Sequence, residues 1–270
     1  MDALELHGGL GGAMAMSVGY ASNPLRIRPT DGSGPLALVS GQASAAFGVA
    51  ASYDRWRLYL DMNMPLAITG QSGTIGEYQF VAPAVDLGSH PDTLSDARIG
   101  LDARLWGEVG GPFRLGAGVQ LFVPNGNRAD YVTDGYYRGM GRVLFAGDLG
   151  GVSYAGLCGV HIRPLDDSPT PGSPQGSELL FGVAAGPRLE LGSGAALVVG
   201  PEVYGETAFR RFLAGPTTGL EALLTGRVEG ELDNGMQLRA KLGAGGGLHP
   251  DYGAPEWRTV VSVEVAGRAR

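Results

Sequence analysis

The sequence predicts an all-β protein, a single closed antiparallel up-and-down transmembrane β-barrel of about twelve strands that covers residues 1–270. Three observations indicate this fold. Apolar side chains recur at every second position over segments of about ten residues, with polar or small side chains between them. Short turns and longer loops separate these segments alternately. No apolar run of about eighteen residues is present, so a transmembrane helix is not expected.

The clearest strand is the segment from Trp56 to Leu66. Because successive side chains of a strand point to opposite faces, its tryptophan, leucine and methionine residues share one face. Arg57, Tyr59, Asp61 and Asn63 then share the other face. A strand of about eleven residues exceeds the usual five or six of a soluble sheet, and it matches the roughly 9–11 residues that cross a bilayer when tilted.

The expected strands follow one another along the whole chain. In the first half they cover Leu4–Tyr20, Ala43–Ala51, Trp56–Leu66, Ala97–Leu105, Phe113–Leu121 and Tyr137–Ala146. In the second half they cover Val152–Arg163, Leu179–Leu191, Leu197–Phe209, Leu220–Val228, Leu238–Ala244 and Trp257–Val265. The strongest tight-hairpin signal is Asp233-Asn234-Gly235. Longer polar connections, such as Ser22–Leu36 and Gly70–Asp92, are expected at the opposite end of the barrel from the tight turns.

Alternation of apolar and polar residues alone also fits a soluble barrel. The types of residue on each face of the strands therefore decide between a membrane barrel and a soluble one. The apolar parity carries no Asp, Glu, Lys or Arg in the central parts of the strands, as a bilayer requires, since a lipid-facing Arg or Lys costs roughly 2–4 kcal/mol. The other parity mixes charges with small residues such as Gly116, Gly118 and Gly186, which suit a crowded lumen. Aromatic residues near the strand ends predict an interfacial girdle: Tyr20, Tyr53, Trp56, Trp106, Tyr154 and Trp257.

The composition limits the classes of partner that the protein is expected to bind. The net charge of −7 and a single lysine, Lys241, give no basic footprint for nucleic acid, so a DNA or RNA partner is not expected. The membrane barrel predicted above makes outer-membrane lipid the expected partner. Cys158 is the only cysteine, which excludes an internal disulfide, and it reads as a small apolar strand residue. No cofactor and no metal is expected. The chain as given shows no signal peptide, so an exported protein would be a mature or recombinant segment.

Charged residues on the lumen parity are the one constellation with functional potential. If neighbouring strands pair in sequence order, opposite charges lie side by side on the inner wall of the barrel. They form either a constriction that filters solutes or a salt-bridge network that fills the interior. The pore-lining candidates are Arg57, Asp61, Asp96, Arg98, Asp102, Arg104, Arg142, Glu202, Glu206, Glu221, Arg227, Arg239, Lys241, Arg258 and Glu264.

Catalysis is not expected. The four histidines, His7, His90, His161 and His249, are scattered, with three on the lumen parity and His90 in a loop. No Gly-x-Ser-x-Gly sequence and no metal-spaced histidine pair is present. We therefore predict that the chain is not an enzyme.

Five short segments carry a resemblance to a known family. They are Gly19–Leu25, Asp96–Gly100, Glu178–Gly182, Glu221–Leu224 and Tyr252–Arg258. Through them the chain resembles the amino-terminal barrels of OmpA-family proteins of myxobacteria and related Gram-negative bacteria. The resemblance implies an outer-membrane barrel followed by a periplasmic peptidoglycan-binding domain. The chain departs from the family in lacking that domain and a terminal aromatic residue, as expected for a barrel excised from a longer protein.

Two functions follow from these expectations. The first is a porin-like passive channel for small solutes and ions, whose selectivity would change when Arg98 and Arg104 are neutralised. The second is a structural outer-membrane anchor with a lumen plugged by salt bridges, which would tether a peptidoglycan-binding domain. An enzyme or a receptor ranks third, because the long loops could bind a partner but show no motif.

Overall fold

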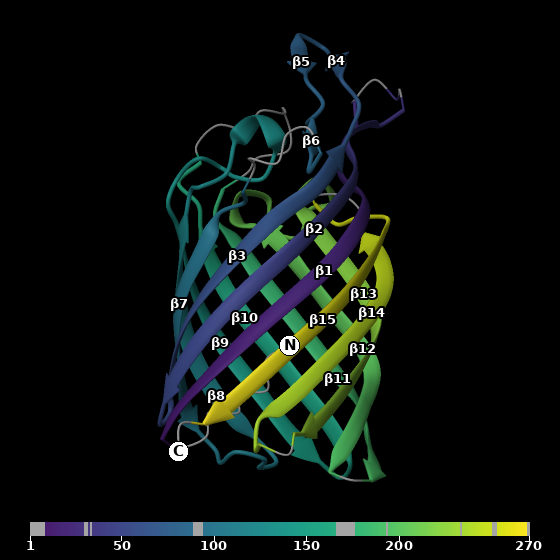
Figure 1. Cartoon of the computed structure of the whole chain (residues 1–270). Coiled ribbons are helices and arrows are strands. Elements are labelled where there is room, and N and C mark those ends of the chain that lie inside the picture. Colours follow the sequence, from purple (N-terminus) through teal and green to yellow (C-terminus); the bar gives the residue numbers. More distant parts are fainter. Residues whose placement is uncertain are drawn as a thin grey trace.

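A computed structural model describes residues 9–29, 32, 34–88, 94–165, 176–192, 194–232, 234–249 and 253–268. Twelve long strands form one closed barrel (Figure 1). The first six are β1 (Leu10–Ile27), β2 (Leu36–Tyr53), β3 (Trp56–Thr69), β7 (Ala97–Trp106), β8 (Arg114–Val123) and β9 (Arg138–Leu149). The others are β10 (Val152–Ile162), β11 (Glu178–Gly192), β12 (Ala195–Ala208), β13 (Thr218–Glu231), β14 (Gln237–His249) and β15 (Trp257–Arg268).

Each long strand pairs antiparallel with its neighbour in the chain, and β1 pairs with β15 from Gly11↔Arg268 to Ser22↔Trp257. This last pairing closes the barrel, so every long strand has two partners. Closure matters because lipid offers no hydrogen-bond partner to an open strand edge. The predicted fold class is confirmed. No helix in the described ranges is long and apolar enough to cross a membrane.

The outer face of the barrel is apolar. Side chains in the middle of the strands, such as Leu58, Val119, Val143, Leu224 and Leu242, point outward and are at least half exposed. Each of them follows the predicted two-residue period. Burial of such side chains is worth roughly 1.5–3 kcal/mol each, so a barrel in water would forgo a large stabilisation that lipid supplies.

Aromatic side chains gather near both rims of the outer face. At the loop end, the rings of Tyr20 and Trp257 lie 5.1 Å apart between centroids. At the short-turn end, Trp56 and Trp106 are exposed, and the Trp106 ring lies 5.7 Å from that of Phe113. Two belts of this kind are typical of a barrel whose ends lie at two membrane–water interfaces.

The structure corrects two predicted loop boundaries. Ser22–Leu36 was expected to be a connection, but β1 continues to Ile27 and β2 begins at Leu36. Two bulges in the β1–β2 ladder make this possible, and Asn23 takes a left-handed φ of 49° there. Its side-chain amide donates to Glu256 at 2.9 Å, which holds the irregular position in place.

Gly70–Asp92 also contains structure that the sequence did not predict. It forms the projecting hairpin β4 (Gly73–Ile75) and β5 (Tyr78–Phe80), followed by β6 (Val85–Asp86), which pairs with β3 (Figure 1). Val85 of β6 packs with Val39 and Ile68 in a small buried cluster that Val132 also contacts. The cluster fastens the loop between β3 and β7 to the rim. Three 3₁₀ turns, η1 (Arg128–Asp130), η2 (Phe209–Arg211) and η3 (Gly215–Thr217), lie in other loops of this end.

Candidate functional site: the charged lumen

A cavity of about 860 Å³ lies inside the barrel. Asn234, Gly235 and Arg268 line it at the short-turn rim, and Arg98, Gln120 and Glu202 line it further inside. Small side chains of β1 and β2 form one wall, and the other strands contribute the charged side chains together with further small and polar ones. The side chains of this wall are small because mainly glycine, alanine and serine occupy the inward-facing positions of β1 and β2.

Cations outnumber carboxylates around this cavity. Among the described residues, nine cationic side chains and five carboxylates line it. The cations are Arg57, Arg98, Arg114, Arg142, Arg188, Arg227, Arg239, Lys241 and Arg268, and the carboxylates are Asp61, Asp148, Glu202, Glu231 and Glu264. The local balance is therefore opposite in sign to the net charge of −7 of the whole chain.

Asp102 of β7 is the centre of one charged cluster. Its side chain has no exposed surface and accepts hydrogen bonds from Arg57 at 2.5 Å and from Arg142 at 2.9 Å. Strand register explains the first contact, because Arg57 and Asp102 are partners in the β3–β7 ladder. A buried carboxylate needs such donors, since desolvation of an unpaired charge costs several kcal/mol.

Tyr59 and Gln120 complete this cluster. The Tyr59 hydroxyl accepts from Gln120 at 2.5 Å and from Arg142 at 2.7 Å. The ring lies across Gly100, where a Cβ atom would collide with the tyrosine ring. Glycine at this position therefore lets the tyrosine lie against the barrel wall and reach Arg142.

A second cluster surrounds Glu229 of β13. It forms ion pairs with Arg188, with Arg227 at 3.1 Å and with Arg239 at 3.8 Å. Arg239 also pairs with Glu264 at 2.7 Å. Nearby, Lys241 donates to both carboxylate oxygens of Glu202 at 2.7 Å. Charges of β11 to β15 therefore meet in two groups of contacts on this wall, one around Glu229 and one at Glu202.

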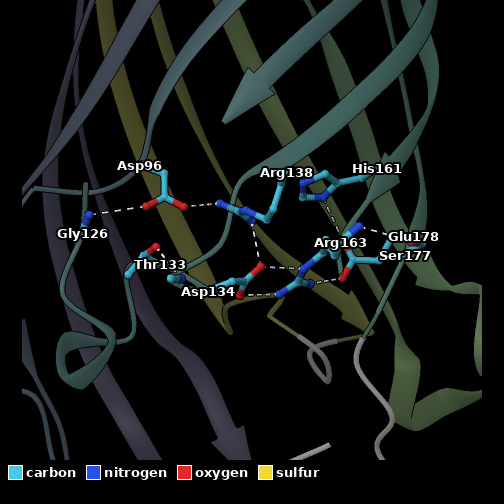
Figure 2. Close-up of polar contacts among 10 residues, drawn as sticks. Asp96, Gly126, Thr133, Asp134, Arg138, His161, Arg163, Ser177 and Glu178 are labelled. Carbon is cyan, nitrogen blue, oxygen red and sulfur yellow. Dashed lines mark hydrogen bonds and ion pairs between the residues drawn. The ribbon is translucent and has the colours of Figure 1, made fainter. Parts of the chain in front are cut away.

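A third cluster, here called the loop-end network, lies near the mouth on the side of the long loops (Figure 2). Arg138 bridges Asp96 at 2.6 Å and Asp134 at 3.2 Å. Arg163 binds Asp134 through two parallel hydrogen bonds of 2.7 and 2.8 Å, and it also contacts Glu178. His161 lies 3.3 Å from Glu178. None of these residues lines the 860 Å³ cavity.

Asp134 belongs to the loop between β8 and β9, and its contacts draw that loop toward the lumen. Burial opposes ionisation of Asp134, but the hydrogen bonds and positive charge of Arg163, together with Arg138, prevail and lower the pKa of the carboxyl group. Tyr131 of the same loop donates its hydroxyl to the Val81 carbonyl at 2.9 Å. The loop is therefore fastened at two points.

The predicted pore-lining residues divide into two groups. Nine of the fifteen line the cavity: Arg57, Asp61, Arg98, Arg142, Glu202, Arg227, Arg239, Lys241 and Glu264. The other six do not: Asp96, Asp102, Arg104, Glu206, Glu221 and Arg258. Asp96 belongs to the loop-end network, Asp102 is covered by its arginines, and Glu221 pairs with Arg258 at 3.2 Å.

The placement of Arg104 differs from the prediction. It lies at a bulge in the β7–β8 ladder, and its guanidinium donates to the Gly107 carbonyl in the adjoining turn. The bulge comes after Arg104, so Arg104 keeps the predicted alternation, but its guanidinium binds the turn and does not line the cavity.

Several lumen residues were missed by sequence analysis. Arg114 and Asp148 pair at 3.1 Å near the short turns, where Asp148 was assigned to a turn rather than to β9. The sequence pattern predicts a loop at Asp134 and the end of a strand at Arg163, so neither residue is counted among the lumen candidates. Arg188 continues the alternation of β11 and was detectable from its parity. His7 and His90 lie outside the described residues, as does the start of the first expected strand.

The described residues contain no group of three or more His, Cys, Asp or Glu side chains that could hold a metal ion. Cys158 is free and exposed on the outer face, in keeping with a small strand residue. The arrangement can bind and orient charged solutes through arginine, and it offers polar contacts from Tyr59 and Gln120.

Comparison with known proteins supports the fold. The structure is similar to an outer-membrane channel from Pseudomonas putida F1, with a TM-score of 0.58, 12% identity, and coverage of 98% of this chain and 97% of that chain. It is also similar to the NanC porin, with a TM-score of 0.54, 6% identity, and coverage of 95% of this chain and 100% of that chain. No known protein family and no curated protein matches the sequence, so the resemblance to OmpA-family barrels stays a prediction. At these identities the likeness shows that this chain has the fold of outer-membrane barrels.

Proposed function

We propose that this barrel lies in the outer membrane of a Gram-negative bacterium and acts as a passive channel for small solutes. The observation that supports this proposal most directly is the charge-lined cavity of about 860 Å³ inside the barrel. An apolar outer face with aromatic belts at both rims supports the membrane location. The similar solved structures are described as a channel and a porin, which agrees with the proposal.

In this proposal the lumen residues select solutes and perform no chemistry. Fixed charges that line a pore change the local concentration of ions and set which solutes enter. The cavity offers arginines on two walls and small uncharged residues on a third, so a solute can pass beside the charges. The loop-end network narrows the barrel mouth on the side of the long loops and sets the size limit for solutes at that mouth.

One observation favours a second function, that of a structural anchor. The loop-end network joins β7, β9, β10, β11 and the β8–β9 loop through consecutive ion pairs, and such a network can plug the mouth. An anchor would have a correctly inserted barrel that passes no solute.

Solute flux distinguishes the two functions. The chain is refolded into liposomes, insertion is verified by heat-modifiable gel migration, and swelling is recorded in isosmotic solutions of small solutes. A channel gives swelling that falls as solute size increases, whereas an inserted barrel that gives none for any solute contradicts the channel and supports the anchor.

A further inference from the structure

The charge balance of the cavity indicates which solutes the channel would favour. Nine cationic side chains and five carboxylates of the residues that the structure describes line it, in a chain whose net charge is −7. Because the field inside a narrow low-dielectric pore depends on the charges that line it, the interior and not the net charge governs permeation.

The excess arises where carboxylates are shared. On the β3–β7–β9 wall, the single buried carboxylate of Asp102 serves both Arg57 and Arg142, whose side chains line the cavity while the aspartate does not. A carboxylate with no exposed surface presents no charge directly to a solute. Two cationic groups compensated by one buried anion leave a positive surplus on this wall.

Arg98 presents a further guanidinium on this wall. It is the register partner of Asp61, yet among the residues the structure describes no ion pair joins the two side chains. Asp61 instead leans toward β2, where its Oδ1 lies 2.5 Å from the position that a Cβ atom would take on Gly48. The lack of a side chain on Gly48 leaves room for this orientation. In the described part of the chain, no carboxylate forms an ion pair with the Arg98 guanidinium, which lines the cavity.

The cavity is large enough to hold a small organic anion. Its volume of about 860 Å³ lies within the range of pockets that hold small molecules. Ala13, Ala15 and Ala50 stand on the uncharged wall and leave the space open. Guanidinium groups suit carboxylates and phosphates, because their planar donors match two oxygens at once.

The carboxylates of the loop-end network lie outside the cavity. Asp96, Asp134 and Glu178 are each contacted by an arginine, so three carboxylates share two arginines there, and Glu221 is paired separately with Arg258. None of these carboxylates lines the cavity, so the charges that line it remain mainly cationic.

We propose that the channel is selective for anions, that its substrates are small organic anions with a carboxylate or phosphate group, and that Arg98 is a selectivity-determining residue. This inference rests on the proposed channel function. It predicts a direction of selectivity and assigns it to a specific guanidinium.

The test is the reversal potential of the refolded barrel in a planar bilayer under a potassium chloride gradient, followed by replacement of chloride with gluconate. The wild type is expected to give a chloride-to-potassium permeability ratio above unity and measurable gluconate current. Arg98→Gln is expected to lower the ratio by roughly twofold, since one uncompensated charge is removed. Arg98→Lys keeps the charge and should keep chloride preference.

Arg55→Gln is the matched control, because Arg55 is exposed in the β2–β3 turn and does not line the cavity. Its ratio is expected to equal that of the wild type. A conducting wild type with a ratio at or below unity, or an Arg98→Gln ratio equal to that of the wild type, overturns the inference and leaves the channel function standing. An inserted but silent wild type overturns the channel function itself, and the inference with it.

Discussion

Arg163 binds Asp134 through two parallel hydrogen bonds of 2.7 and 2.8 Å, and this pair joins the β8–β9 loop to the end of β10. Both side chains are only 14% exposed. Arg163 also contacts Glu178 at the start of β11, so a single guanidinium connects the loop to two strands (Figure 2). The pair therefore positions the loop at the barrel mouth.

Asp134→Asn is expected to loosen this loop. It removes the charge from a bidentate pair and leaves the half-satisfied Arg163 donors buried, at a cost of roughly 1–3 kcal/mol in the free energy of unfolding. The loop should then be cleaved faster by an added protease, and channel conductance should increase because the mouth widens. Glu77→Gln is the control, since Glu77 is exposed in the β4–β5 turn. Equal cleavage of Asp134→Asn and wild type would show that the pair does not hold the loop.

The same pair predicts a response to acid. The pKa of Asp134 is lowered in the folded protein, so its ionised form is favoured by folding. Such a group contributes stability that is fully present above its unfolded pKa of about 3.9 and is lost as pH falls through the folded value. Loop protection from protease should therefore be constant from about pH 7 to pH 5 and decline only below about pH 4. Asp134→Asn should lack this component, and an identical acid profile in that variant would argue against the assignment.

Asp102→Asn should destabilise the barrel strongly. The change leaves Arg57 and Arg142 facing each other without the buried carboxylate that both now contact, which costs about 3–5 kcal/mol. The variant should unfold at a lower urea concentration in detergent, as measured by the loss of heat-modifiable migration. Asp61→Asn is the matched control, because Asp61 also lies on the inner face of the barrel but has no described ion pair, and its unfolding midpoint should change little. Equal destabilisation by the two substitutions would contradict the assigned role of Asp102.

Gly100→Ala tests the packing of Tyr59. A Cβ atom at Gly100 would collide with the tyrosine ring, so the ring must move and its hydrogen bonds to Gln120 and Arg142 must weaken. Overpacking of this kind costs typically 1–3 kcal/mol. Gly141→Ala is the control, since no atom lies within 4 Å of a Cβ added there. The two variants should differ in unfolding midpoint, and matching midpoints would show that Tyr59 adjusts without loss.

The fold and one wall of the site could be predicted from sequence because strand periodicity determines both. Alternation places Arg57 and Asp102 on the lumen face, and pairing in chain order brings β3 beside β7. The order of strands in an up-and-down barrel leaves few alternatives, so contacts between neighbouring strands follow from the sequence.

Contacts that depend on loops or bulges could not be predicted in this way. Asp134 lies in a loop, and its contact with Arg163 depends on how that loop folds back over the rim. Arg104 keeps the expected alternation, but its guanidinium binds the Gly107 carbonyl in the turn beyond the bulge. Asp61 and Arg98 are register partners whose side chains separate because Asp61 leans toward Gly48, a choice of rotamer that periodicity does not determine.

Single-channel conductance of the refolded wild-type chain tests the channel function most directly. The barrel is inserted into a planar bilayer at known salt concentration, and a heat-modifiable gel sample of the same preparation establishes that it is folded. The channel function predicts discrete, stable conductance steps that Asp134→Asn enlarges. A folded and inserted barrel that shows no steps over the tested voltages would contradict it and leave the structural anchor as the function.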